Sequence, residues 1–135
     1  MKSPLVLIAT VISVLIVSGC GGERTGSVGI LDRDVVASAF ADSGEPLAVR
    51  LDMQESDPGS VVDVIFVPAN EDVPNAPFEI TLFEDIDSAV EHVELLKAVA
   101  NSSLEIVSRK NAILTLSDEV TGERRSRILS VFNTL

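Results

Sequence analysis

From Ile30 onward, the spacing of hydrophobic positions alternates between that of helices and that of strands. Apolar side chains recur every three to five positions from Leu31 to Phe40, which predicts a helix with Asp32 as its N-cap and Gly44 just past its end. Three strand-like runs follow. The first and third alternate apolar with polar residues, whereas the second is almost continuously apolar, as in a central strand: Leu47–Met53, Val61–Val67 and Phe78–Glu84.

The second half of the chain repeats this succession with a longer helix. Asp85 or Ser88 can cap that helix, and its expected buried stripe consists of Ile86, Ala89, Val90, Val93, Leu96 and Ala100. Two further strand-like runs, Leu104–Arg109 and Ala112–Leu116, predict a hairpin in which Asn111 takes the positive φ of a tight turn. A final helix is expected from about Thr121 to Phe132.

The predicted order is therefore α-β-β-β-α-β-β-α, within a single domain over residues 30–135. Strands adjoin strands without a helix between each pair, which is typical of the α+β class. We expect an antiparallel sheet of about five strands with the helices packed on one face. A doubly wound parallel sheet would need more crossover helices than this pattern supplies.

The first twenty residues have a different pattern. Lys2 precedes a mostly apolar run from Leu5 to Val17, and the segment ends in Val17-Ser18-Gly19-Cys20. A charged start, an apolar centre and small residues before a cut are typical of a secretory signal. The apolar run would rise only about 20 Å as a helix, short of the ~30 Å that a membrane span requires.

The last four residues of that segment resemble the lipobox of bacterial lipoproteins. The resemblance implies that residues 1–19 are removed as a signal peptide, that the Cys20 thiol carries a fatty acid such as palmitate, and that the mature chain is held on the cell membrane or the outer membrane, on the extracytoplasmic side. A plain secretory signal is the alternative. It would leave Cys20, the one cysteine of the chain, unpaired in an oxidising compartment.

Residues 20–29 comprise the lipidated cysteine and a glycine-rich stretch, GGERTGSVG, that is typical of a flexible tether. Charge on the domain beyond it is uneven. Residues 41–100 contain 14 acids and two bases, whereas residues 101–135 contain four acids and five bases. Nucleic-acid binding is disfavoured because phosphates attract a basic surface. Both an envelope protein and a second copy remain open as partners.

Two groups of charged residues are the candidate interaction sites. One is the acidic loop set Glu55, Asp57, Glu71 and Asp72, and the other comprises Arg124, Arg125 and Arg127. These arginines are predicted to lie at the start of the last helix, where the helix dipole disfavours cations. Carboxylates nearby or a partner explain them better than helix stability does.

We predict no catalytic residues, no metal and no cofactor. His92, the single histidine, falls beside the buried stripe of the second helix, with no nucleophile-elbow pattern near it. The acidic turn containing Asp52, Glu55 and Asp57 leaves calcium open, although it lacks EF-hand spacing. The alternative to a binding module is a small carboxylate- or metal-dependent hydrolase, for which Glu84 and Asp85 are the candidate carboxylates.

A second resemblance covers most of residues 30–135. The helix that ends at Gly44, the strand that leads through Phe83-Glu84-Asp85 into a helix, and the run Arg109-Lys110-Asn111-Ala112-Ile113-Leu114 before a final helix are similar to small α/β lipoproteins of unknown function in Gram-positive and related bacteria. The resemblance implies no activity. The sequence therefore predicts a lipid-anchored binding or assembly module.

Overall fold

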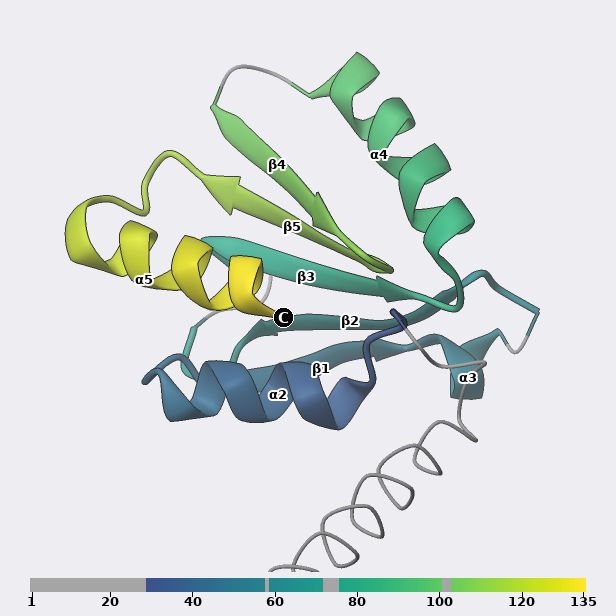
Figure 1. Cartoon of the computed structure of the whole chain (residues 1–135), viewed down its shortest axis with the longest axis horizontal. Coiled ribbons are helices and arrows are strands. Elements are labelled where there is room, and N and C mark those ends of the chain that lie inside the picture. The colour runs from purple at the N-terminus through teal and green to yellow at the C-terminus, as the bar shows by residue number, and fades with distance from the viewer. Residues whose placement is uncertain (1–28, 58, 72–75, 101–102) are drawn as a thin grey trace, which may run out of the picture.

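The computed structural model describes residues 29–57, 59–71, 76–100 and 103–135 (Figure 1). The expected signal peptide, Cys20 and the tether up to residue 28 lie outside the described residues, as does Asp72. Five antiparallel strands form one sheet in the order β1-β2-β3-β5-β4: β1 Leu47–Asp52, β2 Val62–Pro68, β3 Phe78–Phe83, β4 Leu104–Arg109 and β5 Ala112–Ser117. The helices are α2 Arg33–Asp42, α3 Met53–Ser56, α4 Ile86–Val99 and α5 Gly122–Thr134.

The predicted α+β class, the antiparallel sheet and the order of elements are confirmed, with one addition. The short helix α3 stands between β1 and β2, where the sequence predicted only a turn. Its N-cap is Asp52, whose side chain accepts a hydrogen bond from the Gln54 amide at 3.0 Å. A capping carboxylate satisfies a backbone amide that would otherwise have no partner in the helix.

The main core lies between the sheet and the helices α2 and α5. Val36 and Phe40 of α2, and Ile128 and Phe132 of α5, are fully buried against one face of the sheet. The sheet contributes buried side chains from β2, β3 and β5: Val64, Phe66, Phe78, Ile80, Leu82, Ala112, Leu114 and Leu116. Figure 1 shows these two helices together on that side.

The expectation that all helices pack on one face is wrong for α4. Ala89 and Val93 of α4 form a second core with Phe83 and Ile113, which point away from α2 and α5. The reason is that β3 and β5 are interior strands with apolar side chains on both faces. Successive residues such as Leu82 and Phe83 point to opposite faces, so that a helix is needed on each face to bury them. The sheet is therefore covered on both faces, although α4 covers only part of its own face.

In β1 and α4, some apolar residues that the spacing predicted to be buried are exposed to solvent. In β1, Val49 is 53% exposed and Leu51 is 38% exposed, because β1 is an edge strand whose register shifts between these residues. In α4, Ile86 is 38% exposed and Val90 is 52% exposed, because the helix buries a narrower stripe centred on Ala89 and Val93. Periodicity locates an apolar face but not how much of that face a neighbour covers.

The predicted hairpin between β4 and β5 is present, with Arg109 paired to Ala112. Lys110, not Asn111, is the residue with positive φ, at 54°. The prediction of a positive φ at Asn111 is wrong because the side chain of this residue makes buried hydrogen bonds to the backbone instead of forming the turn. Its buried side chain accepts a hydrogen bond from the Leu31 amide at 2.6 Å, and it donates to the Leu31 carbonyl at 3.2 Å and to the Phe83 carbonyl at 2.8 Å.

Replacement of Asn111 by alanine should therefore destabilise the domain. The substitution leaves an amide and two carbonyls without these partners in a buried setting, which should lower the free energy of unfolding by roughly 2–4 kcal/mol. Urea unfolding monitored by circular dichroism measures this change. Asn133→Ala is the matched control, since Asn133 is exposed on α5 and should cost less than about 0.5 kcal/mol. Equal stability of the two variants would contradict the assigned role of Asn111.

Candidate interaction sites

Arg33 is the first residue of α2 and joins that helix to two strands. Its guanidinium makes two hydrogen bonds to the Asp52 carboxylate, at 2.9 and 3.0 Å, and two to the Asp63 carboxylate, at 2.9 and 2.8 Å. Gln54 also donates to Asp63 at 2.6 Å. The hydrogen bonds from Arg33 hold the pKa of Asp52 below its usual range. Planar, two-pronged contacts of this kind fix orientation as well as charge.

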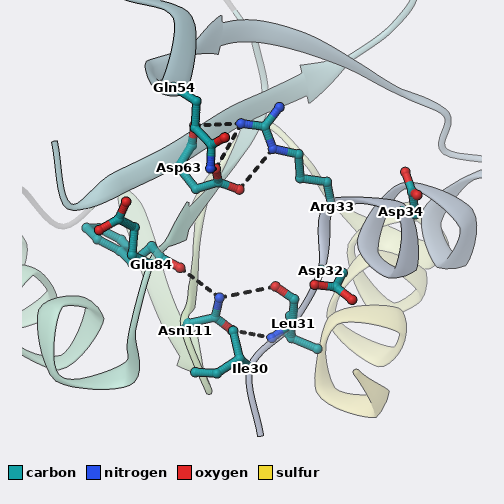
Figure 2. Close-up of a pocket in the computed structure, with 10 residues that line it drawn as sticks. Ile30, Leu31, Asp32, Arg33, Asp34, Gln54, Asp63, Glu84 and Asn111 are labelled. Atoms are coloured by element: carbon teal, nitrogen blue, oxygen red, sulfur yellow. Dashed lines mark hydrogen bonds and ion pairs between the residues drawn. The ribbon is translucent and has the colours of Figure 1, made fainter. Parts of the chain in front are cut away.

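A cleft of about 530 Å³ lies between this ion-pair group and Asn111 (Figure 2). Figure 2 shows Arg33 directed toward Asp63 on one side of the cleft, and Asn111 bonded to Leu31 on the other. Its lining includes four carboxylate residues, Asp32, Asp34, Asp63 and Glu84, and a single cationic one, Arg33. Since that arginine is already paired, the charge of the cleft favours cations over anions.

The predicted acidic loop set does not form one surface. Glu55 and Asp57 are exposed in and just after α3, beyond the end of β1. Glu71 lies beyond the end of β2, and because β1 and β2 are antiparallel, this is the opposite end of the sheet. The Glu71 carboxylate accepts a hydrogen bond from Arg124 at 2.6 Å. The prediction grouped these residues by their charge and their place in loops, but the fold puts them at opposite ends of the sheet.

The three predicted arginines do lie together at the start of α5, but each contacts groups within the domain. Arg124 makes two hydrogen bonds to Glu45, both at 3.1 Å, and Arg127 makes a third at 2.9 Å. Arg125 pairs with Glu105 and donates to the carbonyls of Ser117 and Val120, at 3.1 and 3.0 Å. Carboxylates nearby thus account for cations at the unfavourable end of the helix dipole.

Glu45 is the centre of this group and was missed from the sequence. Gly44, with a φ of 88°, ends α2 as predicted. In the turn that it forms, the amide of the next residue, Glu45, donates a hydrogen bond to the Phe40 carbonyl at the end of the helix. The Glu45 side chain is only 7% exposed. Burial by itself raises the pKa of its carboxyl, but the hydrogen bonds from Arg124 and Arg127 outweigh burial and lower it. The position directly after a helix-ending glycine was the one local signal for Glu45, and it does not identify the arginines that pair with it.

His92 contacts the ring of Phe83, with ring centroids 5.1 Å apart, and is half-buried. Its neighbours in a small cleft are Val61, Ser88, Glu91 and Leu95. Among the described residues, no group of three or more histidine, cysteine, aspartate or glutamate residues has an arrangement that could hold a metal ion. In the same part of the chain, no helix has the length and apolar character needed to cross a membrane.

The outer side of α4 carries large apolar side chains. Leu95 is 62% exposed and Val99 is 80% exposed, and these two residues lie one turn apart on the same side of the helix. Val90 is 52% exposed but lies on a different side. Acidic residues Glu91 and Glu94 lie among them. Single exposed apolar residues are common, but neighbouring ones such as Leu95 and Val99 are typical of surfaces that contact another protein.

No protein-family model matches the chain, and comparison with curated proteins and with solved structures likewise finds no match.

The Glu45 group predicts a specific loss of stability in acid. Because the folded-state pKa of Glu45 lies below its ordinary value of 4.5, its ion pairs stabilise the fold above that pH, and this stabilisation is lost as the pH falls through the lower folded-state pKa. Glu45→Gln should cost roughly 1.5–3 kcal/mol at neutral pH, since it weakens hydrogen bonds between charged groups. It should also flatten the decline in stability below pH 4.5, which urea unfolding across a pH series measures.

Glu71→Gln is the control for this experiment. Glu71 also pairs with Arg124, but its side chain is 34% exposed, so that its removal should cost less than about 1 kcal/mol. Parallel pH profiles for Glu45→Gln and the unsubstituted chain would show that Glu45 does not contribute to acid sensitivity.

Proposed function

We propose that this chain is a lipid-anchored, extracytoplasmic binding or assembly module without catalytic activity. The observation that carries the proposal is the segment Val17-Ser18-Gly19-Cys20, which looks like a lipobox and follows an apolar run of signal-peptide length. The described fold begins at Gly29, nine residues after Cys20. A nine-residue connection reaches at most about 30 Å, which holds the domain close to the membrane surface.

The exposed apolar side of α4 supports binding to a protein. Leu95 and Val99 are more exposed than any other large apolar side chains in the described part of the chain. The arginines of α5, by contrast, are already paired with Glu45, Glu71 and Glu105. We therefore assign the primary contact surface to α4 and not to the arginine cluster, and expect a partner that offers an apolar surface bordered by cations.

Replacement of Cys20 tests the anchor. Cys20→Ala removes the thiol that receives the lipid, so the protein should no longer incorporate labelled palmitate and should move from the membrane fraction to the soluble fraction. Ser18→Ala is the matched control, because it keeps a small residue at that position of the motif and should leave the protein anchored. Palmitate incorporation by Cys20→Ala would refute lipidation at this residue.

Chemical cross-linking in intact cells tests the contact surface. The full-length protein should yield a recurring cross-linked partner, and Leu95→Glu with Val99→Glu should reduce that yield roughly tenfold, since charges are then placed in an apolar contact. Val49→Glu introduces one such charge on β1, at a position that is 53% exposed and far from α4 in the sequence, and should leave the yield unchanged. Retention of the partner by the α4 variant would exclude α4 as the contact surface.

A further inference from the structure

The sheet order leaves β1 and β4 at the two edges. The register of β1 shifts between Val49 and Leu51, an irregularity of the kind that protects an edge from pairing with another strand. By contrast, β4 pairs with β5 along its whole length without a shift. Its sequence, LEIVSR, contains no proline, glycine or lysine. Of the two edges, β4 is therefore the one suited to accept another strand.

The hydrogen bonds of the hairpin show which backbone groups of β4 face this edge. The Asp118 amide donates to the Ser103 carbonyl at 2.9 Å, so that residues 103, 105, 107 and 109 exchange hydrogen bonds with β5. The amides and carbonyls of the alternate residues, Leu104, Ile106 and Ser108, consequently point away from β5. Leu104 and Ser108 also have exposed side chains. A further strand would meet a regular row of donors and acceptors.

The charges along β4 favour one particular strand, a second copy of β4. Glu105 and Arg109 lie two residues on either side of Val107, on the face that α5 covers. If two β4 strands pair antiparallel about Val107, Glu105 of each copy faces Arg109 of the other. Opposite charges on directly facing residues stabilise an antiparallel pair. Pairing centred on Ile106 places Glu105 opposite Val107 and loses both charge pairs.

Both Glu105 and Arg109 can form an additional ion pair without losing their contacts within the domain. The Glu105 side chain is 45% exposed although it pairs with Arg125. Arg109 is half-buried, and its Nε donates to the Leu135 carbonyl at 2.7 Å, which leaves the terminal nitrogens of the guanidinium as further donors. In the pairing about Val107, Glu105 would lie between Arg125 of its own chain and Arg109 of the second copy.

We propose that two copies of the chain associate through their β4 edges, antiparallel and centred on Val107, so that their sheets join into one continuous sheet. The proposal deepens the assembly role and rests on the proposed function, because anchoring in one membrane raises the effective concentration of the copies. The pairing is isologous: the same surface is used by both copies, and it closes as a dimer.

A disulfide at the symmetry centre tests this register. Val107 would face its counterpart as a non-hydrogen-bonded pair, in which the Cα atoms are about 4.5 Å apart, within the range for a disulfide. Full-length Val107→Cys, oxidised in membranes with copper phenanthroline, should therefore run mainly as a dimer on a non-reducing gel. The unsubstituted chain and Val49→Cys, which places the thiol on the other edge, should remain monomeric. A monomeric Val107→Cys protein, or equal dimer from Val49→Cys, would overturn the proposal.

A charge exchange tests the facing pairs. Adding Glu105→Arg to Val107→Cys should lower the dimer yield roughly tenfold, because two like-charged pairs then replace two opposite-charged ones. Further addition of Arg109→Glu recreates opposite charges on the facing residues and should restore the dimer yield. If the yield stays low although the thermal melt of this variant is unchanged, the register is refuted. Sedimentation with membranes reports the anchor separately, so that failure of the pairing and failure of the proposed function are distinguishable.

Discussion

The side chain of Asn111 joins segments that no strand pairing connects. One amide group bonds the amide and carbonyl of Leu31, just before α2, and the carbonyl of Phe83, at the end of β3. Because the site is buried, these backbone groups have no water to replace it. Asn111 therefore fixes the backbone just before α2 and also lines the cleft beside Arg33.

The charges of the domain form a second set of constraints. Arg33 holds α2 to β1 and β2, whereas Arg124 and Arg127 hold α5 to the turn after α2 through Glu45. The arginines expected to face a partner are thus largely occupied within the fold. What remains for association is an excess of exposed carboxylates, the apolar outer side of α4 and the open backbone of β4. Apolar contact and strand pairing therefore suit the proposed assembly better than a basic patch does.

The sequence predicted the helices and strands more accurately than the burial and the contacts of their side chains. Strand-like runs, some alternating and one almost continuously apolar, located the five strands, and Gly44 and Asp85 marked helix boundaries that the structure confirms. Burial of Val49 and Val90 was predicted wrongly, because periodicity does not show which strand lies at an edge or how far a helix extends over a sheet. The partnerships of Arg33, Glu45 and Asn111 join residues far apart in the chain, and no local pattern identifies such pairs.

The central claim is that the mature protein begins at a lipidated Cys20 and acts at the membrane surface. Mass spectrometry of the N-terminal peptide of the protein purified from membranes tests it most directly. The account predicts a peptide that starts at Cys20 and has the added mass of a diacylglyceryl group on sulfur, with or without a third acyl chain. A peptide that starts at Met1, or one that contains an unmodified Cys20, would contradict it.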